Sequence, residues 1–413
     1  MLSVAEVDSL LTDRVAVLPA EQCALTDAVG RVLRESVAAD RDLPPHDRVT
    51  MDGIAVAAAA LGRGGRPLRI EGEARAGDRR RELGDAGDGA LRVMTGAVLP
   101  AGSDTVIRSE DLRLEGDRAW LQPEQPIAPG QNVHRQGSDT RAGATVLTPG
   151  RRISAADIAV LASVGRAEVA VGRRPRVAVI STGDELVDIG RPIAAHQVRR
   201  SNIYVVATAL TGLGYEVDAR HLPDDPDRLA EGVEAALAGH DVLITTGAVS
   251  KGSADFLPGV YRRLGAECYL HGVRQRPGKP LWIGGTGDGK RVFALPGNPV
   301  SVMMCLYRYV VPYLAAAEGA APAPPMHAAL AEEVRFPPPL TLFLPVLLTA
   351  AGGTLAARPA PAQNSGDFLA LVGTDGFLEL AAGEARFAAG SVLPLHPWQP
   401  LAWGAGGGGG GGA

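Results

Sequence analysis

From Arg176 onward, short apolar segments typical of strands alternate with longer segments that have helical spacing. The strand-like segments are RVAVIST, YEVDARHL and DVLITTG, and the helical ones are YVVATALTGLG, PDRLAEGVEAAL, FLPGVYRRLG and PVSVMMCLYRYVVPYLAAA. This alternation predicts a parallel sheet with right-handed crossovers. Because ligands of such sheets bind beyond the carboxyl ends of the strands, the loops that follow the strands are the first candidates for a site.

The rest of the chain has a different character. At 413 residues it is too long for one ordinary core, so we expect several domains. Gly-rich stretches with short alternating runs predict an inserted small β domain at 47–136 and a C-terminal β domain at 327–403, on either side of an α/β domain at 176–320. Residues 1–46 with 137–175 would form a helical and β hinge domain. We expect helices there in LPAEQCALTDAVGRVL and SAADIAVLASVG.

Composition narrows the class of protein. The 41 Lys and Arg residues against 46 Asp and Glu residues leave a slightly negative chain, which argues against a nucleic-acid or membrane surface. Cys23, Cys268 and Cys305 lie far apart without metal-ligand spacing, as buried thiols of a reducing cytoplasm would. The N-terminus MLSVAEVDSLL resembles an amphipathic helix, and no apolar run reaches membrane-spanning length. We expect a cytoplasmic protein whose Gly tail, 404–413, is disordered.

Three loops follow predicted strands of the α/β domain, with the sequences GDEL, GAVSKGSAD and PGNPVS. Their glycines would let backbone amides approach a ligand, and a helix that begins in PGNPVS would offer free amides to an anion. Each loop alone could equally be a capped turn, but three at one sheet edge favour a shared pocket. The GGTGDG run lies between two strand-like segments and predicts a hairpin turn. The candidate binding residues in these loops are Gly183, Asp184, Gly247, Ser250, Gly252, Pro296, Gly297 and Asn298.

Two acids in these loops, Glu185 and Asp255, suggest a metal. Carboxylates beside a phosphate usually imply a bridging divalent cation, and oxygen ligands suit Mg²⁺. The alternative is that either acid caps a helix or forms an ion pair.

The RPGKP turn carries two cations, Arg276 and Lys279, three positions apart. Arg offers a planar fork and Lys a compact charge, a pairing that suits a tetrahedral oxyanion. The alternative is a solvated charged turn. The prolines and the adjacent apolar strand LWIGG make that alternative the weaker one.

Three further polar positions lie outside the α/β domain. Asp52 stands between a turn and an apolar strand, Thr95 follows a strand end, and Asp139 lies in the polar turn RQGSDTRAG. Each could equally be a polar residue that only stabilises a turn. Their distance in sequence from the α/β loops leaves open how they could share a site with them.

Eight motifs occur in one order along residues 1–400: MDGIAV, RVMTGAVLPAGSDTVI, RQGSD, VISTGDEL, TTGAVSKGSAD, RPGKP, LPGNPVS and NSGDF. Together they resemble the molybdopterin molybdenumtransferase family, the bacterial relatives of the C-terminal domain of gephyrin. The resemblance implies an elongated homodimer of four-domain chains with the active site between subunits. It also implies a reaction in which adenylyl-molybdopterin and molybdate react in a Mg²⁺-dependent step that inserts molybdenum and releases AMP.

The resemblance also implies a role for each matching residue. Glu185 and Asp255 would hold the metal and, with Asp52 and Asp139 of the partner subunit, form the catalytic set. Thr95 would join the substrate-binding residues. Molybdate would be bound by Arg276, Lys279, Pro280, Ser301 and Ser365, whereas Arg274 would be a surface charge.

Two features depart from the family pattern. RPGKP has Arg where the family often has Lys, and PPPLTLFLPVLL lacks the basic residue usually found before the first strand of the last domain.

Two other functions stay open at this point. A non-catalytic molybdopterin-binding or scaffold protein could keep the fold, although it would not need the acids. The related molybdopterin adenylyltransferase shares the α/β domain alone, so the additional domains count against it. That enzyme and acceptor molybdoenzymes are instead possible partners.

Overall fold

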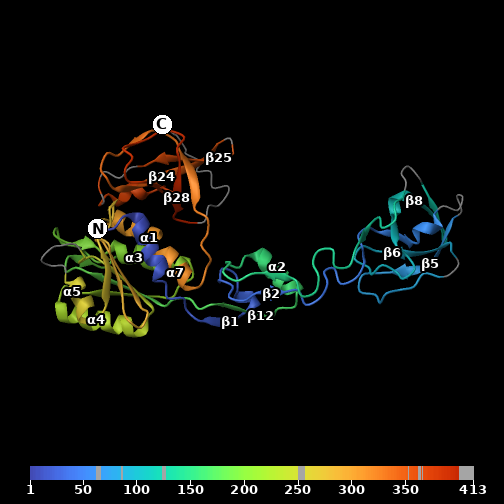
Figure 1. The fold of residues 1–413 in the computed structure, drawn as a ribbon, viewed down its shortest axis with the longest axis horizontal. Coiled ribbons are helices and arrows are strands. Elements are labelled where there is room, and N and C mark those ends of the chain that lie inside the picture. The colour runs from blue at the N-terminus through green and yellow to red at the C-terminus, as the bar shows by residue number, and fades with distance from the viewer. Residues whose placement is uncertain are drawn as a thin grey trace.

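A computed structural model describes all residues except 62–66, 85–86, 123–126, 250–255, 352, 361–363, 365 and 400–413. The molecule is elongated (Figure 1). The α/β sheet and the C-terminal β domain lie together at one end, and the sheet that contains β5 and β6 lies at the other. A slender middle part with β1, β2, β12 and α2 joins them. The Gly tail and the predicted site residues Ser250, Gly252, Asp255 and Ser365 lie outside the described residues.

The α/β sheet has six strands in the order β16-β13-β17-β21-β20-β18. The first four are parallel, as the alternation of strands and helices predicts. β20 runs antiparallel to β21, and β18, antiparallel to β20, runs in the same sense as the first four, so the sheet is mixed where the alternation alone predicted a parallel one. The reason is the predicted hairpin at GGTGDG, because a short turn can join only antiparallel neighbours. The strands are β13 (Val177–Thr182), β16 (Val217–Leu222), β17 (Val242–Thr246), β18 (Glu267–His271), β20 (Trp282–Gly285) and β21 (Arg291–Leu295).

Helices cover both faces of this sheet. Alternate residues of β13 point to opposite faces, so Val179 packs with α1, α3 and the final helical segment, whereas Ile180 packs with α4 and α5. The helices expected around this sheet are all present. They are α1 (Val4–Asp13), α3 (Ser201–Gly212), α4 (Pro226–Gly239), α5 (Leu257–Arg263), α6 (Pro299–Cys305) and α7 (Val311–Ala317).

The last helical segment is interrupted. Between α6 and α7 the chain forms one π-helical turn, η4 (Leu306–Val310). Pro312 explains it, because proline has no N–H to donate and its ring crowds the carbonyl one turn earlier, which widens the helix locally. Within the described residues, 299–317 is the one helix long and apolar enough to cross a membrane. Because 61% of that stretch is buried inside the protein, it is a core helix.

The middle part contains one clear departure from the sequence-based prediction. A helix was expected in LPAEQCALTDAVGRVL, but the chain there forms β1 (Ala20–Ala24) and a short 3-10 turn, η1 (Leu25–Asp27). The prediction was wrong because β1 pairs along its whole length with β12 (Glu168–Gly172). That non-local ladder satisfies the backbone groups that a helix would have satisfied locally. The other elements here are β2 (Val37–Ala38), β3 (Arg48–Val49), β10 (Val133–His134), β11 (Thr145–Leu147) and α2 (Ala155–Ser163).

Two more six-stranded sheets form the β domains. The inserted one has the order β7-β4-β6-β5-β9-β8, with β4 (Gly53–Val56), β5 (Leu68–Ala74), β6 (Gly89–Val93), β7 (Thr105–Arg108), β8 (Leu112–Glu115) and β9 (Arg118–Leu121). It also carries η2 (Ala58–Ala60) and η3 (Ser109–Asp111).

The C-terminal sheet has the order β19-β24-β25-β22-β28-β26. Its edge strand β19 (Gln275–Arg276) comes from the RPGKP region and pairs with β24, so this turn joins two domains. The remaining strands are β22 (Met326–Leu330), β24 (Thr341–Ala351), β25 (Thr354–Pro359), β26 (Gly376–Leu380) and β28 (Val392–Pro397). Short elements complete the chain: β14 (Leu186–Val187), β15 (Val198–Arg199), β23 (Val334–Arg335), β27 (Arg386–Phe387) and η5 (Phe368–Leu371).

Candidate active site

The three loops singled out in the sequence meet at one pocket of about 370 Å³. It lies where β13, β17 and β21 end, which is the carboxyl edge of the parallel strands. The structure therefore brings the GDEL loop, the described start of the second loop (247–249) and the PGNP loop together. The lining residues are Thr182, Gly183, Glu185, Asp224, Gly247, Ala248, Val249, Pro280, Pro296 and Gly297.

Backbone geometry explains why a glycine begins the second loop. Gly247 has φ of +95°, and a Cβ there would lie 3.1 Å from the carbonyl oxygen of Thr182. Its amide donates to the carbonyl of Leu295 at 3.2 Å, which ties the second loop to the third. Asn202, near the start of α3, donates its side-chain amide to the carbonyl of Gly297 at 2.7 Å. The pocket edge is thus held by contacts among the loops and α3.

The acids of the pocket differ in their contacts. Glu185 is exposed, and within the described residues its carboxylate has no hydrogen bond or ion pair. Asp224 accepts a hydrogen bond from the Thr182 hydroxyl, and its own amide donates to Asp184 Oδ1 at 3.2 Å. Glu185 and Asp224 thus offer carboxylate oxygens to one cavity, a donor type that fits a hard cation such as Mg²⁺. No group of three ligating side chains stands close enough to hold an ion alone in the part of the chain that the structure describes. Oxygens of the substrate or of water would therefore have to complete the coordination.

Asp224 was not predicted as a site residue. It follows β16, the fourth parallel strand, so the rule applied to the other three strand ends would have found it.

The RPGKP turn borders the same pocket, because Pro280 lines it. Arg276 and Lys279 are both exposed, and no carboxylate among the described residues forms an ion pair with either. Arg274, by contrast, forms a surface ion pair with Glu6 at 3.5 Å. Two neighbouring cations without a counter-charge are the arrangement that an oxyanion would complete.

Only part of the third loop lines the pocket in the described structure. Pro296 and Gly297 line the pocket, and Asn298 occupies the N-cap position of α6. Ser301 lies in the first turn of α6 and is 3% exposed.

Asp52 and Thr95 form a second cluster, and Asp139 contacts His134. Asp52 Oδ1 accepts hydrogen bonds from the backbone amide and the hydroxyl of Thr95, both at 2.7 Å. These bonds, the backbone one first, lower the pKa of the Asp52 carboxyl below its ordinary value. Asp139 lies 2.7 Å from His134 Nε2, and His134 in turn contacts Arg48.

Asp52 also lines a smaller pocket of about 220 Å³ in the inserted β domain. Because β4 and β6 lie at the far end of the molecule from the α/β sheet, one chain does not bring this cluster to the α/β pocket (Figure 1).

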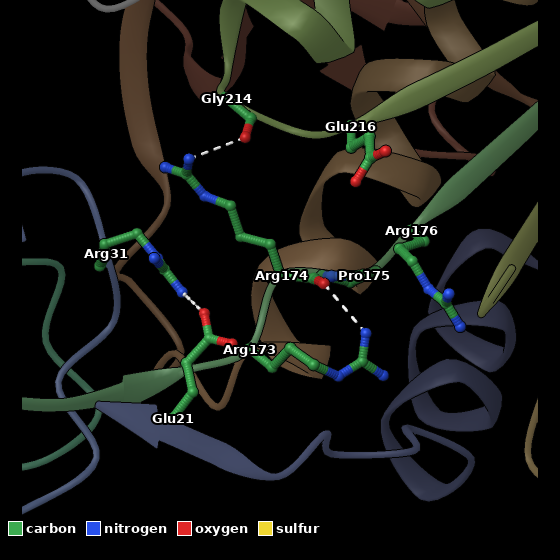
Figure 2. Close-up of a pocket in the computed structure, with 8 residues that line it drawn as sticks. All are labelled: Glu21, Arg31, Arg173, Arg174, Pro175, Arg176, Gly214 and Glu216. Carbon is green, nitrogen blue, oxygen red and sulfur yellow. Dashed lines mark hydrogen bonds and ion pairs between the residues drawn. The ribbon is translucent and has the colours of Figure 1, made fainter. Parts of the chain in front are cut away.

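A larger pocket, of about 630 Å³, lies at the hinge, where β12 leads into β13 (Figure 2). It is rich in arginine, but all four arginines are engaged by the protein itself, Arg176 through an ion pair with Asp241 at 3.9 Å. Arg31 pairs with Glu21, Arg174 donates to the Gly214 carbonyl at 2.7 Å, and Arg173 donates twice to Asp241 at 2.8 Å. Despite its size, this pocket has the chemistry of an interdomain joint, so the smaller pocket at the strand ends is the candidate active site.

Comparisons with known proteins bear on the whole chain. A family model described as "MoeA N-terminal region (domain I and II)" matches residues 2–165. A second, "Probable molybdopterin binding domain", matches 178–316, and a third, "MoeA C-terminal region (domain IV)", matches 327–398.

Similar proteins and structures extend over nearly the full length. A Synechocystis protein named molybdopterin molybdenumtransferase is 41% identical over 372 residues, which cover 89% of this chain and 93% of that protein. A Synechococcus elongatus protein of the same name is 35% identical, covering 95% and 98%. The crystal structure of the molybdopterin biosynthesis moeA protein from Pyrococcus horikoshii OT3 superposes with a TM-score of 0.82 at 26% identity, covering 96% of this chain and 99% of that one.

Proposed function

This chain belongs to the molybdopterin molybdenumtransferase family and is a transferase of molybdenum cofactor biosynthesis, and we propose that it inserts molybdate into adenylyl-molybdopterin with Mg²⁺-dependent release of AMP.

One observation carries this proposal: the pocket at the strand ends has two kinds of charge side by side. Arg276 and Lys279 are cations that form no ion pair with any described carboxylate, on a turn that borders the pocket. Glu185 and Asp224 are acids that line it. The cations suit a free oxyanion, and the acids suit a cation-bridged phosphate. A substrate pair of molybdate and a phosphate ester would need both.

The proposed mechanism rests on positioning. Glu185 and Asp224, with Asp255 from outside the described residues, would hold Mg²⁺, which when bound neutralises charge on the phosphate that is cleaved. Arg276 and Lys279 would hold molybdate beside the dithiolene of the pterin. The glycine-lined loops would fix the pterin and its phosphate through backbone amides. No protein nucleophile is required.

We further propose that the working enzyme is a homodimer. Asp52, Thr95 and Asp139 belong to the same proposed site, but Asp52 and Thr95 adjoin β4 and β6, which lie at the far end of the molecule from the α/β sheet. A second copy placed in the opposite sense would bring them to the α/β pocket. The extended shape of one chain supports this arrangement. The proposed setting is cytoplasmic, with the adenylyltransferase that makes the substrate and acceptor molybdoenzymes as partners, and with no role for nucleic acid or a membrane.

The proposal is tested by AMP release from adenylyl-molybdopterin in the presence of Mg²⁺ and molybdate. Glu185→Gln and Asp255→Asn are expected to abolish release, since each removes a metal ligand. Lys279→Ala is expected mainly to raise the molybdate concentration required. Arg274→Gln is the matched control, because Arg274 stands in the same segment but its side chain forms a surface ion pair with Glu6.

The scaffold alternative predicts a different result. A protein that only binds molybdopterin would bind the pterin but release no AMP at any molybdate concentration. Binding without turnover would therefore replace the enzymatic proposal.

A further inference from the structure

In the segment VRQRPGKP, one uncharged residue, Gln275, stands between exposed cations and is itself fully buried. Gln275 is 0% exposed, whereas Arg274 and Arg276 on either side are exposed. The alternation follows from β19, in which successive side chains point to opposite sides. The neutral side chain of Gln275 therefore points into the protein, whereas the neighbouring cations point to solvent.

Every polar atom of the buried Gln275 amide has a partner. Nε2 donates to the carbonyl oxygen of Pro277 at 3.2 Å and to Sγ of Cys305 at 3.5 Å. Oε1 accepts a hydrogen bond from the hydroxyl of Tyr309. Cys305 and Tyr309 are themselves almost completely buried. A satisfied buried network of this kind rigidifies the groups that it joins.

The turn packs directly onto this amide. Gly278 has φ of +89°, and a Cβ at this position would lie 2.6 Å from Gln275 Nε2 and 2.7 Å from Cys305 Sγ. Any larger residue would push the turn away from the network. The base of the turn is closed by the Val273 amide, which donates to the Lys279 carbonyl at 2.9 Å. Its tip is held by the Gln275 bond to Pro277 and by the Leu281 amide, which donates to the Gly278 carbonyl at 3.2 Å.

The network also reaches the helix that begins at the pocket. Cys305 ends α6, whose first turn follows the pocket residues Pro296 and Gly297. Tyr309 lies in η4, the π-helical turn that directly continues α6. Gln275 thus joins the cationic turn and the α6–η4 segment, two parts of the proposed site that come from different stretches of sequence.

From these contacts we propose that Gln275 is a positioning residue, which fixes Arg276 and Lys279 in the geometry that binds the oxyanion. The inference rests on the proposed function, since it takes molybdate as the ligand of that turn. Gln275 itself would touch no substrate. It would act through the Pro277 carbonyl and through its anchorage to Tyr309 and Cys305.

The test separates affinity for molybdate from turnover. Gln275→Leu removes the donor to Pro277 and the acceptor for Tyr309, so we expect a rise of roughly five- to tenfold in the KM for molybdate. We expect kcat at saturating molybdate to stay within about twofold, because the acids that line the pocket are untouched. Tyr309→Phe keeps the ring and removes only one hydrogen bond, so roughly a threefold rise is expected, with the fold intact even if Gln275→Leu fails to fold.

Arg274→Gln and Lys279→Ala are the controls. The first changes an exposed neighbour whose side chain pairs with Glu6 and should leave the molybdate KM unchanged. The second removes a proposed contact and should raise it. Equilibrium binding of molybdate to each variant in the presence of the pterin substrate gives a second readout that does not depend on turnover.

The outcomes distinguish the inference from the function on which it rests. If Lys279→Ala raises the molybdate KM but neither Gln275→Leu nor Tyr309→Phe does, the positioning role is overturned and the proposed function stands. If the Gln275 and Tyr309 variants lose only thermal stability or kcat, their role is structural and the inference again fails. If Lys279→Ala itself leaves molybdate KM and binding unchanged, the oxyanion assignment fails, and the inference fails with it.

Discussion

Arg308 offers the sharpest test of how the domains are held together. Its side chain is 12% exposed and stands on η4. The two terminal nitrogens donate to both oxygens of Asp8 on α1, each at 2.7 Å, and Nε donates to Glu379 on β26, also at 2.7 Å. One guanidinium therefore joins the N-terminal helix, the α/β domain and the C-terminal sheet.

The substitution Arg308→Met keeps the apolar stem and removes the charge. Glu379 would then keep only His396, at 3.1 Å, for a carboxylate that is 18% exposed. Leaving one member of a buried ion pair without its partner costs about 3 kcal/mol of unfolding free energy. Arg335→Met is the control, because that arginine is 73% exposed beside Glu333 and should change the unfolding free energy by about 0.5 kcal/mol or less.

The sign of the pH dependence makes the test specific. Burial by itself raises the pKa of Glu379, but the hydrogen bond from His396 and the charge of Arg308 outweigh it, so the pKa lies below the ordinary 4.5. In the wild type this group stabilises the fold above pH 4.5, and its contribution is lost as the pH falls through the folded pKa. Without Arg308, burial and the loss of a cation would raise the folded pKa instead. The loss of unfolding free energy in Arg308→Met, relative to the wild type, should then be large near neutral pH and smaller in acid.

Urea unfolding of both proteins, followed by circular dichroism at neutral pH and below pH 4.5, measures this difference. The reasoning is refuted if Arg308→Met is destabilised equally at both pH values. It is also refuted if its deficit at neutral pH is no larger than that of Arg335→Met.

Three further predictions follow from the site. Gly247→Ala should destabilise the fold by about 1–2 kcal/mol, because φ is +95° and the new Cβ would lie 3.1 Å from the Thr182 carbonyl oxygen; an unchanged urea midpoint would contradict this. Asp224→Asn should raise the Mg²⁺ concentration for half-maximal AMP release several-fold, and an unaltered Mg²⁺ titration would remove it from the metal site. Asp52→Asn and Glu185→Gln chains, each inactive alone, should recover about a quarter of wild-type activity after random mixing, since half the dimers would carry one intact site; a mixture that stays inactive would contradict a shared site.

Local sequence patterns predicted the α/β domain well because its strands and helices are long and strongly periodic. Outside that domain the patterns also located β5, which spans LRIEGEA, and α2, which lies within SAADIAVLASVG. The failure in the middle part has a physical cause: pairing with a distant strand determined whether the segment became a helix or a strand. The segment at Ala20–Ala24 becomes a strand only because β12 lies beside it. The reversal of β20 against β21 was instead predictable, because the hairpin at GGTGDG is a local signal.

The pocket was predictable to the extent that it follows from the order of the strands. The rule that ligands bind at strand ends located the loops of Glu185, Gly247 and Gly297, and applied to β16 it would also have located Asp224. The anchorage of RPGKP was not predictable. Gln275 stands 34 positions before Tyr309, and no local pattern indicates that its amide is buried against η4. The distance between Asp52 and the α/β pocket likewise depends on how the hinge directs the inserted domain.

The central claim is that this chain couples cleavage of the adenylyl phosphate to insertion of molybdenum. The most direct measurement follows both products when the purified protein is incubated with adenylyl-molybdopterin, Mg²⁺ and molybdate. The account predicts that AMP and molybdenum-bound pterin appear in equal amounts and that both fall to background when molybdate is omitted. AMP release at an unchanged rate without molybdate, or pterin binding with no AMP formed, would contradict it.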